Sequence, residues 1–236
     1  MRSFPSISPP IINASGILSY PEVFETFESQ GASIGGYVTK SIGPNEKKGN
    51  ENPVIIYSDT FDGPTLNSLA LPTQELDDWV EELSNIKLKK TLLIASIYAG
   101  NPKEFSFVAE KICPFADVIE INLGCPNKEP GEKTIMESIG QNPSLSGEIT
   151  ARVRDITDKP IIAKLSPNSD YLSVAEKCLQ SGADGLGCAN TLGPGLSIDI
   201  KTREVILAGT SGGISGRALK PINLLMTFEA FARFAC

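Results

Sequence analysis

A cysteine between two asparagines is the most distinctive reactive group in the sequence. Cys125 lies in the run INLGCPN, which spans residues 121–127 and follows directly on an apolar stretch. A thiol at this place could serve as an acid–base group. The alternative is a buried structural cysteine in a turn, because free cysteine is among the most buried residue types. The flanking Asn122 and Asn127, with the proline at a strand end, favour a functional role.

Polar side chains also follow other predicted strands. Lys40 stands at the end of the second strand, Lys164 follows the apolar run 161–163, and Asn190 and Thr191 end the sixth strand. A single lysine is usually a surface residue, but a lysine at the end of an apolar strand needs a partner or a ligand. In barrels of parallel strands, the loops after the carboxyl ends build the active site. Lysines and amides that converge there suit a planar anion with ring N–H and C=O groups.

Residues 209–216 (GTSGGISG) form a glycine-rich run before Arg217 and a predicted helix. Glycine-rich turns at helix N-termini expose backbone N–H groups that bind phosphate. The run alone does not establish such a site, because glycine-rich loops are common. The sequence has neither a GxxxxGK[ST] motif nor a GxGxxG motif after a strand, so binding of a nucleoside triphosphate or a Rossmann-type dinucleotide is not supported.

These residues depend on short apolar strands that alternate with amphipathic helices. Strands are predicted near 10–13, 36–40, 91–97, 116–123, 160–165 and 184–189, and helices over 21–30, 73–86, 101–112, 145–157, 171–180 and 218–234. Repeated strand–helix units predict a parallel sheet with helical crossovers. A closed (β/α)8 barrel has eight such units. We therefore expect an α/β fold of (β/α)8 TIM-barrel type with about six of the eight units, in a single domain over residues 1–236.

Two segments interrupt this alternation. Residues 50–71 and 197–207 are predicted to form β-hairpin insertions. Thr73, directly after the first insertion, is the predicted N-cap of the next helix.

The composition excludes several classes of protein. The chain has 236 residues, of which 41% are hydrophobic and 21% charged, as in ordinary globular proteins. Its net charge of −7, without a basic block, argues against nucleic-acid and anionic-membrane partners. No apolar run approaches the roughly 20 residues that span a bilayer, and the first residues lack a signal-peptide core.

The absence of histidine narrows the chemistry further. Pairing of serine or cysteine with histidine is excluded, as is a histidine-ligated zinc site. Any acid–base group is then a Cys, Asp, Glu, Lys or Tyr. The five cysteines are widely spaced and form no CxxC pair, which argues for a reduced cytoplasmic protein and against a metal site.

Seven motifs, in order along nearly the whole chain, resemble those of the dihydroorotate dehydrogenase family. They are Asn13-Ala14-Ser15-Gly16, Val38-Thr39-Lys40-Ser41, Asn67-Ser68-Leu69-Ala70-Leu71-Pro72, Ile121-Asn122-Leu123-Gly124-Cys125-Pro126-Asn127, Lys164-Leu165-Ser166-Pro167, Asn190-Thr191, and Ser211-Gly212-Gly213-Ile214-Ser215-Gly216-Arg217-Ala218-Leu219-Lys220-Pro221. Any one of them can arise by chance, whereas the ordered set is specific.

The resemblance implies an FMN enzyme of class 1, the soluble cytoplasmic class, that oxidises (S)-dihydroorotate to orotate in pyrimidine biosynthesis. Class 1 is indicated because its catalytic base is a cysteine, whereas the membrane-associated class 2 uses serine. Cys125 would remove a proton from C5, and a hydride would pass from C6 to flavin N5. Activity is then expected to rise with pH until the thiol, with an ordinary pKa of about 8.5, ionises.

The resemblance also implies the other site residues. The substrate would be bound by Lys40, Asn67, Leu69, Ala70, Leu71, Asn122, Asn127, Asn190 and Thr191. The flavin would be bound by Ala14, Ser15, Gly16, Lys40, Ser41, Asn122, Lys164, Gly212 and Gly213. Lys164 would lie by the N1/C2 carbonyl edge, where a positive charge stabilises the reduced anion. Gly212 and Gly213 would approach the ribityl-phosphate.

The sequence departs from the family pattern in two ways. Leu69-Ala70-Leu71 stands where Met-Gly-Leu is usual, and the extra methyl group of Ala70 is expected to tighten the site. The family also continues beyond the last residue, with two more strands and with glycine-rich loops that hold the FMN phosphate.

Several alternatives remain open at this point. One is another flavin-dependent pyrimidine dehydrogenase, and a second is a C-terminally truncated barrel without catalysis, which binds, regulates or has no function. A metal site on the cysteines is the least supported. The electron acceptor is also open, because class 1 members use either fumarate or a second subunit with FAD and an iron–sulfur cluster. Homodimers are usual in the family.

Overall fold

The computed structural model describes residues 4–31, 34–57, 65–124 and 139–235. Its main feature is a five-stranded parallel sheet with the strand order β1-β4-β5-β6-β7. The strands are β1 (Gly36–Val38), β4 (Leu92–Ile97), β5 (Val118–Asn122), β6 (Ile161–Lys164) and β7 (Gly185–Gly187). An isolated parallel bridge between Ile12 and Gly36 adds the first predicted strand beside β1. Every predicted strand region therefore lies in chain order around one curved sheet.

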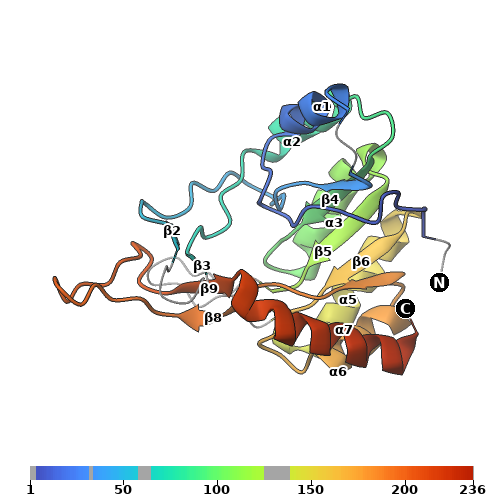
Figure 1. The fold of residues 1–236 in the computed structure, drawn as a ribbon. Helices are drawn as coiled ribbons and strands as arrows, with labels where there is room; N and C mark the ends of the chain where they lie inside the picture. The colour runs from blue at the N-terminus through green and yellow to red at the C-terminus, as the bar shows by residue number, and fades with distance from the viewer. Residues whose placement is uncertain (1–3, 32–33, 58–64, 125–138, 236) are drawn as a thin grey trace.

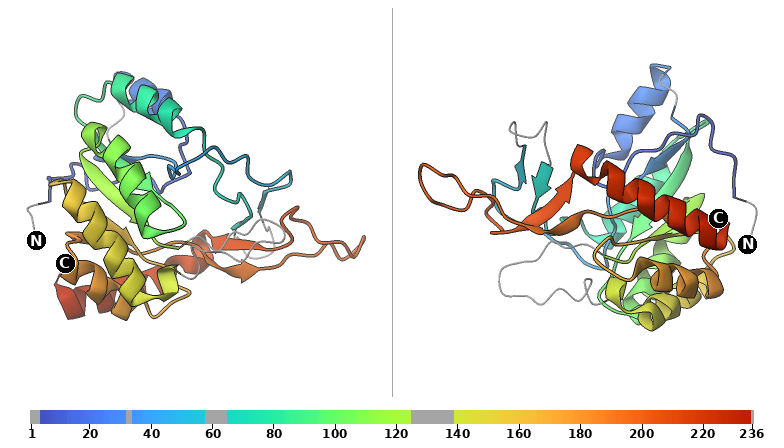
Figure 2. Two further views of the ribbon diagram at one scale, coloured as in Figure 1. Left: turned by 180° about the vertical axis from the view of Figure 1, so that it is seen from behind. Right: turned by 60° about the horizontal axis from the view of Figure 1, so that its bottom comes forward.

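Helices cover the outer face of this sheet and join its strands (Figures 1 and 2). They are α1 (Pro21–Ser29), α2 (Leu76–Asn85), α3 (Pro102–Ile112) with the short η2 (Cys113–Phe115), α5 (Pro143–Ile156), α6 (Tyr171–Gln180), and η3 (Arg217–Leu219) followed by α7 (Lys220–Phe234). Asn101, Asn142 and Asp170 start α3, α5 and α6, because each side chain accepts backbone N–H groups of the first turn. The resulting half-barrel confirms the predicted fold, an incomplete (β/α)8 barrel.

The start of α2 differs from the prediction, and Thr73 is not its N-cap. Glu75 occupies the N-cap position without a side-chain hydrogen bond. The hydroxyl of Thr73 instead accepts a hydrogen bond of 2.8 Å from the indole nitrogen of Trp79. The backbone of Thr73 also pairs with Lys47 in an antiparallel bridge. Thr73 therefore satisfies a buried indole, and this contact takes the place of the cap.

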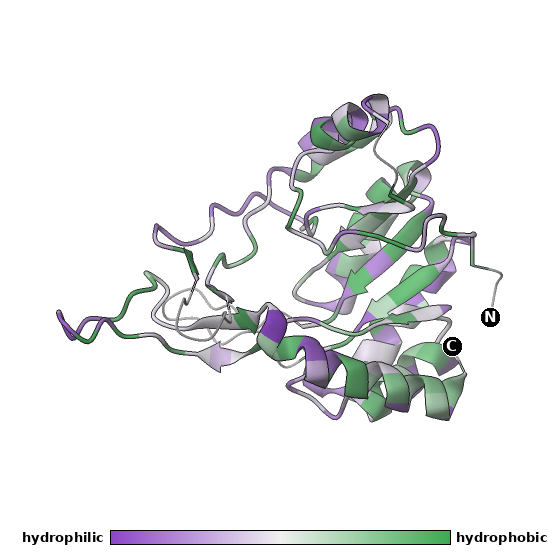
Figure 3. Cartoon of the chain, in the orientation of Figure 1, coloured by the Kyte–Doolittle hydropathy of each residue, from purple (hydrophilic) through white to green (hydrophobic). Residues whose placement is uncertain are grey.

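The strands of the parallel sheet are mostly hydrophobic (Figure 3); nearly all residues of β1, β4 and β5 are buried on both faces, whereas those of β7 are half-buried. On the outer face, Ile119 and Ile121 of β5 are fully buried in the main core beneath the helices. On the inner face, Val38, Ile94 and Val118 form a separate apolar layer inside the half-barrel. Within the described ranges, no helix combines the length and the hydropathy needed to cross a membrane.

A second, antiparallel sheet stands to one side of the half-barrel (Figure 1). Its strand order is β2-β3-β9-β8, with β2 (Ile55–Ile56), β3 (Thr65–Asn67), β8 (Leu192–Gly195) and β9 (Gly212–Ser215). The β2–β3 pair confirms the first predicted insertion. The second prediction is confirmed in outline, because an antiparallel bridge joins Ile198 and Val205, and the paired strands β8 and β9 extend this hairpin on either side. The two insertions meet because β3 pairs with β9.

Part of the glycine-rich run is a strand, where the sequence predicted a turn. Gly213 and Ser215 of β9 pair with Asn67 and Thr65 of β3. A Cβ atom on Gly212 would lie 2.4 Å from the carbonyl oxygen of Asn67, so the absence of a side chain permits this close approach. The turn itself comes later, at the residue before η3.

Candidate active site

A cavity of about 360 Å³ lies between the carboxyl ends of the parallel strands and the antiparallel sheet. Many of the predicted site residues line it: Ala14, Ser15, Gly16, Lys40, Ser41, Asn67, Leu69, Leu71, Asn122, Lys164, Asn190 and Thr191. The fold brings them together because the carboxyl ends of parallel strands meet at one end of a barrel. The antiparallel sheet supplies Asn67 from the opposite side.

Three predicted residues are not among the described residues that line this cavity. Gly212 pairs with Gly195 of β8 and Gly213 with Asn67 of β3, and the carbonyl of Gly213 accepts a bond of 3.3 Å from the Asn67 side chain. Ala70 is 1% exposed, and its backbone has a φ of 59°. The predicted base Cys125 and the predicted ligand residue Asn127 lie outside the described residues.

Asn13 holds the N-terminal loop over the cavity. Its side-chain oxygen accepts a hydrogen bond of 2.7 Å from the N–H of Val38, and its side-chain nitrogen donates one of 2.8 Å to the carbonyl of Val38. The next turn requires glycine at Gly16, where φ is 88°. A Cβ on Gly16 would lie 3.6 Å from Nζ of Lys40, so this loop passes directly beside the lysine.

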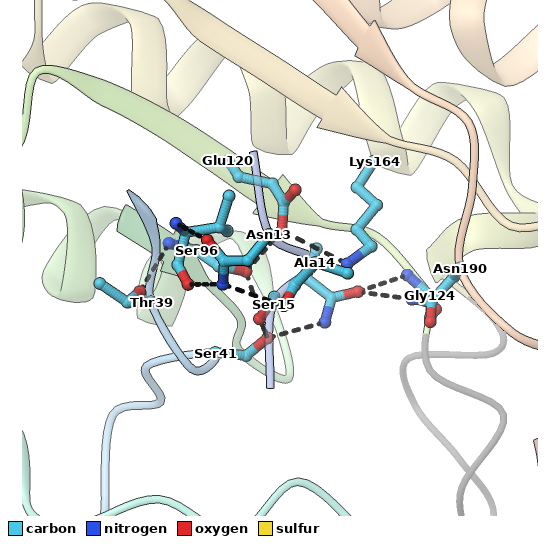
Figure 4. A network of polar contacts seen from close by, with 12 residues as sticks. Asn13, Ala14, Ser15, Thr39, Ser41, Ser96, Glu120, Gly124, Lys164 and Asn190 are labelled. Carbon is cyan, nitrogen blue, oxygen red and sulfur yellow. Dashed lines mark hydrogen bonds and ion pairs between the residues drawn. The ribbon is translucent and has the colours of Figure 1, made fainter. Parts of the chain in front are cut away.

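The hydroxyl of Ser41 is the centre of a polar network on the cavity wall (Figure 4). It lies 3.2 Å from the hydroxyls of both Ser15 and Ser96. The side-chain nitrogen of Asn122 donates to Ser41 Oγ at 3.1 Å. Asn190 in turn donates to Oδ1 of Asn122 at 2.9 Å. Five separate chain segments are therefore fixed to one another by side-chain hydrogen bonds at the cavity.

Glu120 is a buried acid that the sequence analysis did not identify. Its Oε1 accepts a bond of 2.8 Å from Ser96 Oγ and lies 3.5 Å from Lys164 Nζ. Lys164 was expected to need a partner or a ligand because it ends an apolar strand. Glu120 is that partner, since a buried charge is unfavourable unless it is paired. The available signal was an acidic residue within an apolar strand, two positions before Asn122 and therefore on the same face.

Further described residues complete the lining of the cavity: Ile17, Ile55, Thr65, Ala189, Ser215, Gly216, Leu219 and Asn223. Asn223 lies in the first turn of α7, and no residue in the described ranges forms a hydrogen bond with its buried Oδ1. Thr191 Oγ1 is likewise buried without a partner. The sequence offered little to single out Asn223, because asparagine near a helix start is common.

Two of the cysteines belong to the core. Burial raises the pKa of the Cys178 thiol to about 11, although the Thr150 hydroxyl acts in the opposite direction. Burial also raises the pKa of Cys113 above its usual range. Both thiols therefore stay protonated near neutral pH. In the described part of the chain, no group of three or more His, Cys, Asp or Glu side chains could hold a metal ion.

The chain matches the family model for dihydroorotate dehydrogenase over residues 6–235. Two similar proteins are catalytic subunits of dihydroorotate dehydrogenase B (NAD(+)). The one from Pyrococcus abyssi is 38% identical over 222 residues, which cover 93% of this chain and 71% of that protein. The one from Methanocaldococcus jannaschii is 34% identical over 231 residues, which cover 95% of this chain and 72% of that protein. The chain thus spans about 70% of the length of these relatives.

A solved structure shares the fold. The crystal structure of dihydroorotate dehydrogenase from Eimeria tenella in complex with ferulenol superimposes with a TM-score of 0.76. The match covers 96% of this chain and 67% of that one, at 18% sequence identity. The half-barrel, the match over residues 6–235 and the identity to the archaeal subunits agree, and the chain belongs to the dihydroorotate dehydrogenase family.

Proposed function

We propose that this chain, as a class 1 dihydroorotate dehydrogenase, oxidises (S)-dihydroorotate to orotate with bound FMN in pyrimidine biosynthesis. The observation that carries the proposal is a pair of oxygens in the cavity. Thr191 Oγ1 and Asn223 Oδ1 are buried without a hydrogen-bond partner among the described residues, and both residues line the same cavity. A buried unsatisfied polar atom typically costs about 1–3 kcal/mol. A ligand with suitably placed polar groups removes that cost.

The donor set of the cavity fits a flavin. Lys40 and Lys164 bring positive charge to the carboxyl ends of β1 and β6, and the Ser41 network supplies hydroxyl and amide groups. We place Ala14, Ser15 and Gly16 against the face of the flavin ring and Lys164 at its N1/C2 carbonyl edge. When bound, FMN supplies the acceptor for the hydride that leaves C6 of the substrate.

The remaining residues bind the substrate and move its proton. The amides of Asn67, Asn122 and Asn190 hydrogen-bond the pyrimidine ring, and Lys40 attracts the carboxylate. Cys125 takes the proton from C5. Loss of that proton from C5 and of a hydride from C6 leaves the C5=C6 double bond of orotate, so atoms and electrons balance.

The ribityl-phosphate end of FMN requires a revised assignment. Gly212 and Gly213 were expected there, but neither is among the described residues that line the cavity, whereas Ser215 and Gly216 are. We infer that this last part of the glycine-rich run approaches the ribityl chain. Gly216 has a φ of 80°, which suits a turn that exposes backbone N–H groups.

The names of the relatives suggest which acceptor takes the electrons from the reduced flavin. Those proteins are catalytic subunits of an NAD(+) enzyme, whereas this sequence carries no dinucleotide fingerprint and no cysteine cluster. We infer that a second subunit with FAD and an iron–sulfur cluster accepts the electrons. Homodimerisation is a further part of this proposal.

The first test is the visible absorption spectrum of the purified 236-residue chain after incubation with FMN. We expect retained flavin, and bleaching of its absorption when dihydroorotate is added without oxygen. Dihydrouracil, which lacks the carboxylate, is the matched control and should bleach the flavin far more slowly. A chain that takes up no flavin would contradict the proposal and favour the alternative of a barrel without catalysis. Faster bleaching by dihydrouracil would instead indicate another pyrimidine dehydrogenase.

A further inference from the structure

Glu120 lies behind the cavity wall rather than in it. The residue is 7% exposed and faces the interior of the half-barrel between Val118 and Asn122. In the sheet register it stands opposite Ser96 of β4 and Ile162 of β6. Burial of a carboxylate at this place is unfavourable unless partners compensate for the lost hydration.

Two contacts determine the orientation of this carboxylate. Ser96 donates its hydroxyl proton to Oε1 at 2.8 Å, and the ammonium group of Lys164 lies 3.5 Å from the same oxygen. The side chains of Glu120 and Lys164 are only 10% and 13% exposed, so solvent screens this pair less than a surface pair. Lys164 lines the cavity, and Glu120 contacts it from the inner side.

The same carboxylate connects to the other polar residues of the cavity. Ser96, its hydrogen-bond donor, lies 3.2 Å from Ser41 Oγ, which accepts the Asn122 amide. Along its hydrogen bonds, the network leads from Lys164 and Glu120 through Ser96, Ser41 and Asn122 to Asn190 (Figure 4). A change in charge at Glu120 therefore affects the cavity residues in two ways. It acts directly on Lys164, and it acts on Ser41 through the hydroxyl of Ser96.

We propose that Glu120 is a positioning residue that fixes Lys164 at the cavity wall and offsets its positive charge. Resting on the proposed function, this means that flavin bound against Lys164 is harder to reduce than it would be beside an uncompensated lysine. Reduction adds negative charge to the flavin, and a nearby cation favours that state. A carboxylate at 3.5 Å from the cation weakens the field that the flavin experiences.

The test is the reduction potential of FMN in the loaded protein, measured by equilibration with a reference dye. Glu120→Gln keeps the shape of the side chain and its acceptor for Ser96, but removes the charge. We expect at least a tenfold shift of the equilibrium towards reduced flavin, which corresponds to about 30 mV for a two-electron couple. Glu120→Asp keeps the charge but draws it back by one methylene group, so we expect a smaller shift in the same direction.

Glu148→Gln is the matched control. It removes an acid of the same type from an ion pair with Arg152 on α5, which is outside the cavity lining, and should leave the potential unchanged. A purely structural role for Glu120 would lower thermal stability and flavin affinity without a change in potential. An unchanged or lowered potential in Glu120→Gln, or in Glu120→Asp where the first variant does not fold, would overturn the inference. Failure of the unaltered chain to bind FMN would instead overturn the proposed function.

Discussion

Asn223 offers an acceptor that no described protein group uses, and its replacement should have two effects of opposite sign. Asn223→Leu is close in size and removes the buried unpartnered oxygen. We expect the free energy of unfolding of the ligand-free chain to rise by about 1 kcal/mol, because that oxygen no longer lacks a partner. FMN affinity should fall by about tenfold, because the ligand loses a hydrogen bond. Urea unfolding and a fluorescence titration with FMN measure the two effects.

Thr227→Val is the control for this variant, since Thr227 is exposed on α7 and does not belong to the cavity lining. It should leave FMN affinity unchanged. If Asn223→Leu lowers stability and binds FMN as tightly as the unaltered chain, the oxygen is not a ligand contact.

The pH profile of flavin reduction should identify the catalytic thiol. With Cys125 as base, the rate of bleaching by dihydroorotate rises with pH up to about 8.5, where an ordinary thiol ionises. Cys178 cannot produce that profile, because burial raises its pKa to about 11. We expect Cys125→Ser to lower the rate by about 10²–10⁴-fold, the usual contribution of a general base. Stopped-flow spectroscopy across the pH range measures it.

Cys188→Ser is the matched control, since Cys188 is a partly buried cysteine that does not line the cavity. It should keep both the rate and the profile. A Cys125→Ser variant with the original pH dependence would mean that another group takes the proton.

The elements of the half-barrel followed from the sequence, and those of the antiparallel sheet did so only in part. Apolar runs such as residues 91–97 identify buried strands without knowledge of their partners. β8 and β9 are rich in glycine and acquire strand structure through β3, far away in the chain. No local pattern encodes that pairing. Thr73 was misassigned for a similar reason, because its partner Trp79 became visible only in three dimensions.

The site shows the same division between local motif and spatial context. The motifs predicted most of the lysines, amides and hydroxyls of the cavity, since each is a polar group at a strand end. Glu120 and Asn223 were missed, because their significance lies in what surrounds them. Glu120 pairs with Lys164, and Asn223 faces a cavity in which no group of the described chain donates to its oxygen.

Gly212 controls how closely β9 approaches β3. In Gly212→Ala the new methyl group would lie 2.4 Å from the Asn67 carbonyl oxygen, so the two strands must separate. We expect a loss of about 1–3 kcal/mol in the free energy of unfolding, as for other overpacked sites. FMN and orotate should also bind less tightly, because Asn67 moves with β3. Chemical denaturation and ligand titration measure both effects.

Gly185→Ala is the control for this variant, because a methyl group there would meet Phe4 at an ordinary contact distance of 3.7 Å. It should leave both the stability and the affinity nearly unchanged. Equal losses in the two variants would show that the effect does not depend on the β3–β9 contact.

The side chain of Glu28 connects α1 to the segment before β4 through hydrogen bonds. Its carboxylate accepts backbone N–H bonds from Lys89 at 2.7 Å, Lys90 at 2.9 Å and Thr91 at 3.0 Å. Burial alone raises the pKa of Glu28, but these donors outweigh it and hold the pKa below its usual range. The stabilising contribution is therefore present above the unfolded-state pKa and disappears as the pH falls through the lower folded-state value.

Glu28→Gln should accordingly destabilise the chain at neutral pH by about 1–3 kcal/mol, and the difference from the unaltered chain should vanish in acid. Thermal unfolding at a series of pH values measures the difference. Glu110→Gln, on the exposed face of α3, is the control and should behave like the unaltered chain. A loss in Glu28→Gln that is the same at every pH would exclude a role for the charge.

In the whole molecule, the cavity is the place where the two sheets meet. Its lining runs from Ala14 near the start of the chain to Asn223 in α7, so a bound ligand contacts nearly the full span of the described sequence. The inner face of the half-barrel changes from the apolar layer around Val118 to the polar group around Asn122. The apolar layer therefore contributes to the stability of the fold, whereas the polar layer at the carboxyl ends of the same strands lines the cavity.

The contact between β3 and β9 also dictates an order of assembly. Asn67 and Gly213 are 146 residues apart in the chain, whereas the neighbouring parallel strands from β4 to β7 are linked through one α-helix each. Contacts between distant residues close larger loops and form later than local ones. A ribosome releases β3 long before β9 exists, so the growing chain can build its half-barrel first. The cavity is completed only once Asn223 has emerged, so we expect a ligand to enter it late in the maturation of the protein.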